Sequence, residues 1–275
     1  MTVTKGQNLN FAIPINEVLG VYKHAEVKPN SLSASLYNFR GINEYSKGNY
    51  SGAINYYKES IALDPSYFSA YANLGSVYGA KGDIESGITY LKKAIEIQPY
   101  YSYAYYNLGV LYSSKNEVEA AIFYLKKAIS IDSEYYEAYF RLGLCYGFKQ
   151  ETEPSILYYE KALSLNPYYV DAYYHLGLAL CVKRDFGTGI VYLKKAIALN
   201  PDYSDVYYGL GAAYANKGEV ESAIPSLKRA IELNPKFAEA YFLLGVLYQN
   251  KGDVDLKNYY LNKAFELNPS LKNSK

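Results

Sequence analysis

The stretch Tyr203–Glu221 reads YSDVYYGLGAAYANKGEVE, and its pattern returns in other parts of the chain. Tyr67–Glu85 reads YFSAYANLGSVYGAKGDIE, and Ala238–Asp255 reads AEAYFLLGVLYQNKGDVD. One glycine of this pattern recurs at a constant step of 34 residues, at Gly41, Gly75, Gly109, Gly143, Gly177, Gly211 and Gly245. A fixed period of this length predicts a solenoid in which similar repeats stack on one another.

Each repeat is predicted to contain two helices. When repeats are numbered from 1 to 34, with Ala34 as position 1 of the first, apolar or small residues fill positions 4, 7, 8 and 11. This spacing places them on one side of a helix. Glycine at position 15 is expected to end that helix in the left-handed conformation, at Gly48, Gly82, Gly218 and Gly252. The next residue is then expected to cap a second helix, at Asn49, Asp83, Asp185 and Asp253.

Seven repeats are expected to fill most of the 275 residues, so the predicted fold class is all-α. Their predicted bounds are 34–67, 68–101, 102–135, 136–169, 170–203, 204–237 and 238–271, with a tail at 272–275. Residues 1–33 do not follow the repeat. Alternating apolar residues from Leu9 to Ile15 predict a short strand there. Asn16 is expected to cap a short helix, Glu17 to His24, with one apolar side formed by Val18, Leu19 and Tyr22. A disordered tail is the alternative.

The composition argues against several classes of protein. Lys and Arg number 28 and Asp and Glu 27, so the net charge of +1 provides no general attraction to nucleic acid or anionic membranes. No apolar run is long enough to span a membrane, and the N-terminus lacks the order of a signal peptide. Two cysteines and two histidines make a disulfide framework or a metal site improbable. Catalytic and cofactor-binding motifs are not found, so neither catalysis nor a cofactor is predicted.

The repeated residues resemble the tetratricopeptide repeat family. That family's pattern has an aromatic residue at position 4, Leu–Gly at 7 and 8, alanine at 20 and 27, and proline at 32. Position 4 is tyrosine in every repeat here: Tyr37, Tyr71, Tyr105, Tyr139, Tyr173, Tyr207 and Tyr241. The resemblance covers residues 34–271 and implies a right-handed superhelix of antiparallel helix pairs. It also implies a protein-binding scaffold, not an enzyme, with a concave groove lined by the first helices.

Three repeats depart from the family pattern. Arg40 and Glu44 replace a leucine and an aromatic residue in the first repeat, which is expected to weaken its inner packing. Pro225 falls within the second helix of the sixth repeat, where it is expected to remove a hydrogen bond and bend the helix. Lys257 and Asn258 in the last repeat are typical of a terminal repeat that faces water.

The side of each first helix opposite its apolar stripe carries the candidate binding residues, at positions 2, 5 and 6. The predicted peptide-binding groove consists of Asn73, Tyr103, Tyr106, Asn107, Glu137, Phe140, Arg141, Asp171, Tyr174, His175, Asp205, Tyr208, Glu239 and Phe242. Asparagine amides suit a peptide backbone, aromatic rings supply apolar area, and carboxylates favour basic ligand residues. In the alternative interpretation, the acids only favour helix starts and the rings only fill space between helices.

A protein or peptide partner with basic residues is therefore predicted, and self-association stays open. Aromatic rings on helical repeats could also stack RNA bases, but the acidic residues and the small net charge argue against nucleic acid. Membrane insertion is not expected.

The stretch GQNLNFAIPINEVL, from Gly6 to Leu19, resembles the closing strand and helix of trypsin-like serine proteases of the HtrA type. None of that family's catalytic His, Asp or Ser motifs occurs here. This resemblance implies an alternative function, as the C-terminal targeting or substrate-recruiting domain of a protease whose catalytic part is absent from this chain. The lack of a signal peptide predicts a cytoplasmic location, whereas origin from such a fusion predicts export.

Overall fold

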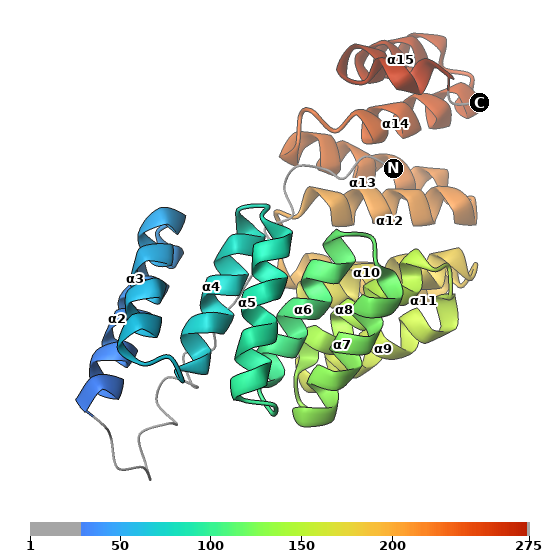
Figure 1. Ribbon diagram of the computed structural model, residues 1–275. Helices are drawn as coiled ribbons and strands as arrows, with labels where there is room; N and C mark the ends of the chain where they lie inside the picture. Colours follow the sequence, from blue (N-terminus) through green and yellow to red (C-terminus); the bar gives the residue numbers. More distant parts are fainter. Residues whose placement is uncertain (1–28, 274–275) are drawn as a thin grey trace. The chain divides into compact units, whose positions relative to one another are not determined.

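The computed structural model describes residues 29–273, and every regular element within them is helical (Figure 1). The α-helices are α2 (Pro29–Ser46), α3 (Tyr50–Leu63), α4 (Phe68–Ala80), α5 (Ile84–Ile97), α6 (Ser102–Ser114), α7 (Val118–Ile131), α8 (Tyr136–Phe148), α9 (Thr152–Leu165), α10 (Val170–Val182), α11 (Phe186–Leu199), α12 (Ser204–Lys217), α13 (Val220–Leu233), α14 (Ala238–Lys251) and α15 (Val254–Leu267). A 3-10 helix, η1 (Pro269–Asn273), follows. The predicted strand and the predicted helix Glu17–His24 lie outside the described residues.

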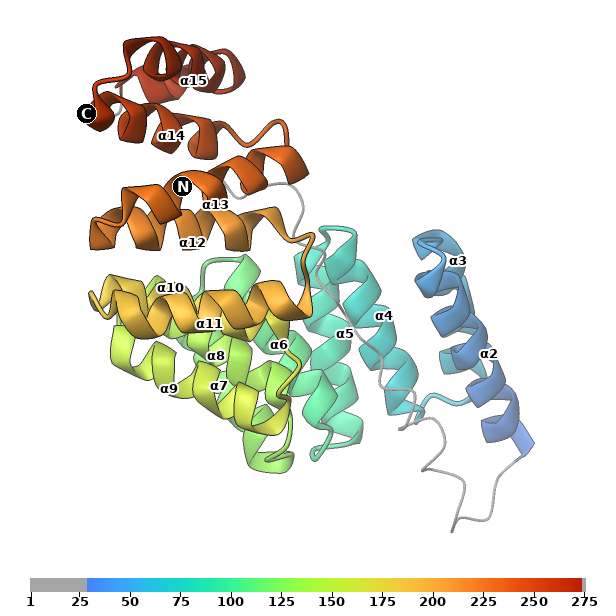
Figure 2. The same cartoon turned by 180° about the vertical axis from the view of Figure 1, so that it is seen from behind.

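The chain divides into two compact units, and the division falls within α8. We call them the N-terminal unit, up to Ala138, and the C-terminal unit, from Tyr139 onward. In the first, α2 packs on α3, α4 on α5 and α6 on α7; in the second, α10 packs on α11, α12 on α13 and α14 on α15. Figure 2 shows the last pair, α14 and α15, from behind. These tandem helix pairs confirm the predicted all-α fold class.

Glycine at position 8 lets the two helices of a repeat approach closely. A Cβ atom on Gly75 would lie 2.8 Å from the carbonyl oxygen of Gly87, which belongs to the facing helix. A Cβ atom on Gly177 would lie 3.0 Å from the carbonyl oxygen of Gly189. Backbone atoms of packed helices cannot move aside cheaply, so any larger residue would push the pair apart.

Leucines at positions 7 and 24 fill the interior of the helix pairs. They are fully buried at Leu74, Leu91, Leu108, Leu125, Leu142, Leu176, Leu193, Leu227 and Leu244. In the first repeat, position 7 is Arg40, which is exposed and lies over the ring of Tyr37. Tyr57 takes position 24 there and is fully buried, with no hydrogen-bond partner for its hydroxyl among the described residues. The first repeat thus keeps a buried centre, at the cost of one unpaired polar atom.

The turns inside the repeats use the predicted glycines. The backbone angle φ is +76° at Gly48, +86° at Gly82, +85° at Gly218 and +77° at Gly252. Three other turns place a larger residue in the same left-handed region, with φ of 64° at Asn116, 61° at Gln150 and 65° at Arg184. The four predicted N-caps are also confirmed, because each side chain accepts a hydrogen bond from the backbone N–H three residues later.

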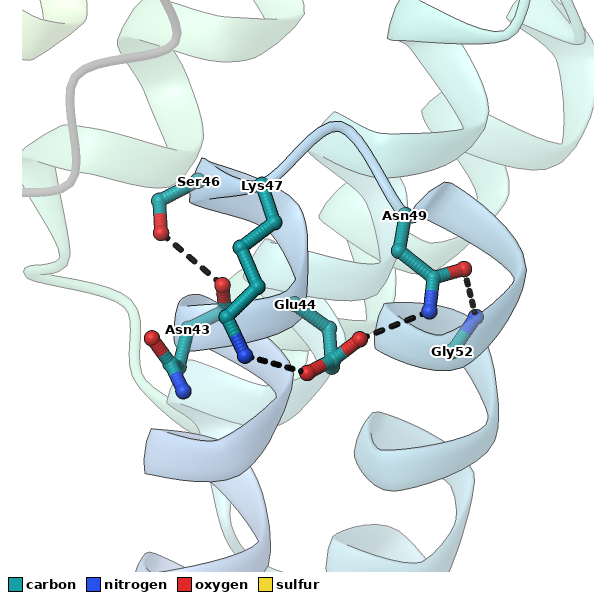
Figure 3. Close-up of polar contacts among 6 residues, drawn as sticks. All are labelled: Asn43, Glu44, Ser46, Lys47, Asn49 and Gly52. Carbon is teal, nitrogen blue, oxygen red and sulfur yellow. Dashed lines mark hydrogen bonds and ion pairs between the residues drawn. The ribbon is translucent and has the colours of Figure 1, made fainter.

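Glu44 belongs to the corner between α2 and α3 (Figure 3). Its carboxylate accepts hydrogen bonds from Lys47 Nζ at 2.9 Å and from Asn49 Nδ2 at 2.6 Å. Asn49 Oδ1 in turn accepts from the backbone N–H of Gly52 at 3.0 Å. The hydrogen bonds from Lys47 and then Asn49 hold the pKa of Glu44 below its usual value. A residue that departs from the repeat pattern therefore orients the N-cap of α3.

The other two departures lie in the C-terminal unit. Pro225 is exposed, and α13 runs without a break from Val220 to Leu233 around it. Near the end of the chain, Asn258 is exposed and Lys257 is half-buried on α15. Leu271 of η1 packs against the apolar cluster of this end.

Candidate functional site

Four candidate residues of the N-terminal unit are covered by protein. The exposed fraction is 3% at Asn73, 1% at Tyr103, 5% at Tyr106 and 0% at Asn107. Asn73 Nδ2 donates to Asn38 Oδ1 of the preceding repeat at 3.0 Å, and Asn107 Nδ2 donates to the backbone oxygen of Tyr103 at 2.8 Å. These side chains therefore contribute mainly to packing between helices in the present structure.

Two acceptors in this unit remain unsatisfied. Oδ1 of Asn73 and Oδ1 of Asn107 are buried and have no hydrogen-bond partner among the described residues. Buried polar atoms without partners are rare in folded proteins, because each loses its hydrogen bonds to water.

Six candidate residues of the C-terminal unit are more accessible. Asp171, Asp205 and Glu239 lie in the first turns of α10, α12 and α14, where the helix dipole favours a negative charge. Asp205 and Glu239 are exposed, and Asp171 is half-buried. Contacts join α10 to α12 and α12 to α14, so the three helices are neighbours. The half-buried rings on the same helices are Tyr174, Tyr208 and Phe242. We call these six residues the acidic–aromatic face.

The carboxylates of this face lie close to tyrosine hydroxyls. Tyr203 Oη donates to Asp171 Oδ1 at 3.3 Å. Burial, followed by the charge of Asp171, raises the pKa of Tyr203 well above its usual value. Burial and then the charge of Asp205 raise the pKa of Tyr174 in the same way, although Asp205 belongs to the next repeat. The electrostatic effect thus extends from one repeat to the next.

The same relation holds one repeat further along. Burial and then the charge of Glu239 raise the pKa of Tyr208. Within residues 29–273, Asp171, Asp205 and Glu239 make no ion pair with lysine or arginine. Protonated tyrosines and uncompensated carboxylates therefore share one surface.

His175, at position 6, lies among aromatic rings. Its ring centroid is 5.0 Å from that of Tyr174, 5.5 Å from that of Phe140 and 5.8 Å from that of Tyr159. Burial, assisted by the positive charge of Arg141, lowers the pKa of His175 to about 4. The imidazole is therefore neutral at pH 7 and behaves as part of an apolar cluster.

Three candidates remain, all on α8; Glu137 lies in the N-terminal unit, where it is half-buried. Phe140 and Arg141, on the same helix, belong to the C-terminal unit; Phe140 is 5% exposed and Arg141 is half-buried. The structure therefore brings together the acidic–aromatic face and not the full predicted set.

Models of the tetratricopeptide repeat family match most of the chain. A TPR repeat model matches residues 43–82, 190–218 and 213–252, and two tetratricopeptide repeat models match residues 66–134 and residues 136–169 and 238–271. The chain is a tetratricopeptide repeat protein. Members of this family are scaffolds for protein–protein interaction, and that is the general function of this chain.

Solved tetratricopeptide repeat structures resemble the chain. YrrB, described as a TPR protein with an unusual peptide-binding site, is 30% identical over 65% of this chain and 92% of its own, with a TM-score of 0.55. MamA is 32% identical over 60% of this chain and 96% of its own, also with a TM-score of 0.55. PilF of Pseudomonas aeruginosa, at 21% identity, covers 77% of this chain and 99% of its own with a TM-score of 0.67, which supports the fold alone. No curated protein sequence matches the chain.

The tetratricopeptide repeats contain a second row of rings that the sequence analysis missed. The last residue of a repeat, position 34, packs on the position 5 ring of its own repeat. Centroid distances are 4.8 Å for Tyr106–Tyr135, 4.9 Å for Phe140–Tyr169, 5.7 Å for Tyr174–Tyr203 and 4.9 Å for Tyr208–Phe237. The 34-residue period was a sufficient signal, since position 34 is aromatic in six repeats: Tyr67, Tyr101, Tyr135, Tyr169, Tyr203 and Phe237.

No group of three or more His, Cys, Asp or Glu side chains in residues 29–273 is arranged to hold a metal ion. No helix in that part of the chain combines the length and apolar character needed to cross a membrane. Cys145 and Cys181 are both free thiols.

Proposed function

We propose that the acidic–aromatic face binds an extended, basic segment of a partner protein, and that the chain acts without catalysis. The observation that carries this proposal is the recurrence of a carboxylate in three successive repeats, at Asp171, Asp205 and Glu239, without a basic partner in the described residues. Like charges kept close together on one surface repel, and a cationic ligand would relieve that repulsion.

The spacing of the repeats defines the ligand further. The first helices that carry the carboxylates pack directly on one another. Packed helices lie about 8–10 Å apart, and an extended chain advances about 3.3 Å per residue. One repeat therefore corresponds to roughly three ligand residues. A segment with lysine or arginine at every third position would place one cation beside each carboxylate.

The rings of the face supply the remaining contacts. Tyr174 and Tyr208 have raised pKa values, so their hydroxyls keep their protons at neutral pH and can donate hydrogen bonds to ligand carbonyl oxygens. Their half-buried rings, together with Phe242, offer apolar area at a small loss of side-chain freedom. The peptide-binding site named for YrrB supports a peptide as the ligand.

Other predicted residues enter this proposal differently. Asn73, Tyr103, Tyr106 and Asn107 are buried, so a ligand could reach them only if the covering side chains moved. Their role in binding stays a prediction. The alternative role as the recruiting domain of a protease also stays a prediction, since the resemblance behind it lies on residues 6–19, outside the described part of the chain.

The test uses a synthetic ten-residue peptide with lysine at positions 1, 4, 7 and 10 and a fluorescent label. Its affinity is compared between the unchanged protein and a variant carrying Asp171→Asn, Asp205→Asn and Glu239→Gln. Exposed ion pairs contribute about 0.5 kcal/mol each, so the variant should bind about tenfold more weakly. Raising the salt concentration should reduce the difference.

The matched control carries Glu134→Gln, Glu160→Gln and Asp255→Asn, which change the net charge equally at exposed positions away from the face. It should bind the peptide like the unchanged protein. Equal weakening of binding in both variants would mean that net charge alone, and not the acidic–aromatic face, attracts the peptide. Unchanged affinity in the first variant would show that the face is not the binding site. Circular dichroism of both variants verifies that the helices persist.

A further inference from the structure

One side of α11, the second helix of the fifth repeat, is exposed along the length of the helix. Its residues recur at helical spacing and are Gly187, Thr188, Val191, Lys194, Lys195, Ala198 and Leu199. Residues three, four, seven and eight positions apart lie on one side of a helix. Val191 is 52% exposed and Leu199 is 39% exposed. We call these seven residues the α11 outer side.

The α11 outer side differs in charge from the same side of the neighbouring second helices. On α9, α13 and α15, positions 18 and 29 of the repeat carry acidic residues: Glu153, Glu221, Asp255, Glu232 and Glu266. In α11 these two positions are Gly187 and Ala198. Among the second helices within residues 29–273, α11 alone contains no acidic residue. Its outer side therefore combines two adjacent cations and apolar area with no negative charge.

The glycine at position 18 of this repeat replaces an ion-pairing residue. In the last two repeats, Lys251 at position 14 pairs with Glu221 at position 18 of the preceding repeat, at 2.6 Å. The corresponding residue before Lys217 is Gly187, and Lys217 pairs with Glu219 of its own repeat. Packing between repeats would thus be served by an acid at position 187. The acid-free character of the α11 outer side is not a requirement of the solenoid.

Lys194 and Lys195 are exposed and make no ion pair with a carboxylate in the described part of the chain. Lys194 Nζ lies 5.6 Å from the ring centroid of Tyr214, in the next repeat. Lys195 Nζ lies 5.1 Å from the ring centroid of Tyr192, on α11 itself. An aromatic ring attracts a cation over its face without neutralising the charge. The rings therefore hold both ammonium groups at the surface, where they can attract an anionic ligand.

We propose that the α11 outer side binds an amphipathic helix of a partner protein, in which acidic residues lie between apolar ones. Val191 and Leu199 lie on either side of the two lysines along α11, so the ligand needs carboxylates between two apolar residues. Positions i, i+3, i+4 and i+7 of a helix provide this order on one side. The small residues Gly187 and Ala198 let a second helix approach closely.

Two other anionic partners fit this surface less well. On the flanking helices, Glu160 of α9 and Glu221 of α13 are exposed at the repeat positions of Lys194 and Gly187. These carboxylates would repel the phosphates of a nucleic acid or of an anionic membrane that extended over all three helices. A single partner helix is about 10 Å wide, and the α11 outer side is about 18 Å long. Such a helix can lie on α11 without covering the neighbouring acids.

The probe is a synthetic, fluorescently labelled helical peptide of fourteen residues. It has leucine at positions 3 and 10, glutamate at positions 6 and 7, and alanine or glutamine elsewhere. A reference peptide of the same composition has glutamate at positions 5 and 8, on the opposite side of the helix. Fluorescence anisotropy with the full chain should show that the first peptide binds about fivefold more tightly, because only its carboxylates face the lysines. Equal binding of the two peptides, or no binding of the first, would overturn the proposal.

A charge-reversal variant carries Lys194→Glu and Lys195→Glu. Glutamate already occurs at these two repeat positions, at Glu160 and Glu59, so the fold accommodates it. The variant should bind the first peptide roughly thirtyfold more weakly, because two attractions become two repulsions. Unchanged affinity would overturn the proposal.

The matched control carries Lys92→Glu and Lys93→Glu, which make the same change at the same repeat positions of α5. It should bind the first peptide like the unchanged protein, and equal weakening in both variants would overturn the proposal.

Gly187→Glu separates binding from folding. A Cβ atom there would have no neighbour closer than Asp185 Oδ1, at 3.9 Å, and the new carboxylate could pair with Lys217. The variant should therefore keep or raise the thermal stability while binding the first peptide about twofold more weakly. Tighter binding of the peptide by this variant would contradict the proposal.

Three further measurements test other occupants. Vesicles containing phosphatidylserine and single-stranded RNA should bind more weakly than the first peptide. Stronger binding of either one, lost in the charge-reversal variant, would overturn the proposal in favour of a phosphate ligand. Light scattering should give the same mass for the unchanged protein and for the charge-reversal variant. Self-association that the charge reversal abolishes would assign the α11 outer side to a second copy and would also overturn the proposal.

Discussion

Position 5 of the first helices has different environments in the third repeat and in the fifth and sixth repeats. In the N-terminal unit, Tyr106 and Asn107 are buried, whereas in the C-terminal unit Tyr174 and Tyr208 are half-buried beside acidic side chains. Position 2 shows the same contrast, since Tyr103 is fully buried and Asp205 is exposed. The same helical positions therefore form core in the third repeat and a candidate binding surface in the fifth and sixth. The size and polarity of neighbouring side chains decide which of the two results.

The largest expected effect compares the position 5 rings of the two units. Tyr106→Ala removes a buried ring and should lower the free energy of unfolding by about 3–5 kcal/mol. Tyr208→Ala removes a half-buried ring and should cost only about 1–2 kcal/mol. Urea unfolding followed by circular dichroism measures both. A larger loss for Tyr208→Ala would contradict the assignment of position 5 to core in the third repeat and to surface in the sixth.

The dependence of unfolding free energy on pH distinguishes two residues at position 6, His175 and Asn107. The pKa of His175 is about 4 in the folded state and about 6.5 in the unfolded chain, so the unfolded chain binds the proton first as pH falls. The stability that neutral His175 contributes is complete above pH 6.5 and is lost as pH falls toward 4, by about 2–3 kcal/mol. Relative to His175→Gln, the unchanged protein should lose stability over this range. Asn107→Gln should show no such pH-dependent difference.

The buried amides provide a comparison within the N-terminal unit. Asn73→Leu deprives Asn38 Oδ1 of its donor and should cost about 1–3 kcal/mol of unfolding free energy. Both substitutions remove an unpaired Oδ1, but Asn107→Leu breaks a bond only to the backbone of its own helix, so its effect should stay within about 1 kcal/mol. Thermal unfolding of the two variants distinguishes these cases. Equal losses of stability in the two variants would mean that the hydrogen bond between Asn73 and Asn38 contributes no more than the bond within one helix.

The smallest effects concern the left-handed turns. Gln150→Gly and Arg184→Gly in the C-terminal unit should each stabilise the protein by about 0.5–1 kcal/mol, because glycine accepts a positive φ without strain. Asn116→Gly in the N-terminal unit should gain less, since asparagine tolerates this conformation better. Gly82→Ala, the reverse change, should destabilise by a similar amount. Destabilisation by Gln150→Gly would show that its side chain matters more than its backbone angle.

Much of the fold could be predicted because the repeat applies the same physical constraint many times. Gly75 and Gly177 must be small where two backbones meet, and Gly82 must accept a left-handed conformation. These requirements appear directly as residue types at fixed positions. The positive φ of Gln150 was not predicted, because glutamine rarely adopts this backbone conformation and its presence does not indicate one.

The candidate site was harder to predict because accessibility depends on more than one helix. A helical wheel places Tyr106 and Tyr208 at the same angle. It represents a single helix, however, and the residues that cover these two rings lie outside that helix. Tyr135 packs on the first ring and Phe237 on the second. The burial of Asn107 likewise could not be deduced from its position in the repeat. The acidic residues were easier to place, because the first turn of a helix is a defined location.

In the third to sixth repeats the position 34 ring packs on a ring of the same repeat, and these pairs can be followed by fluorescence. The chain contains 36 tyrosines and no tryptophan. Phe237→Trp would introduce the only indole, in contact with Tyr208, and its fluorescence would report the loss of that contact. Tyr203→Trp and Tyr135→Trp would do the same for the contacts with Tyr174 and Tyr106. A stopped-flow series over these variants would reveal the order in which the array comes apart.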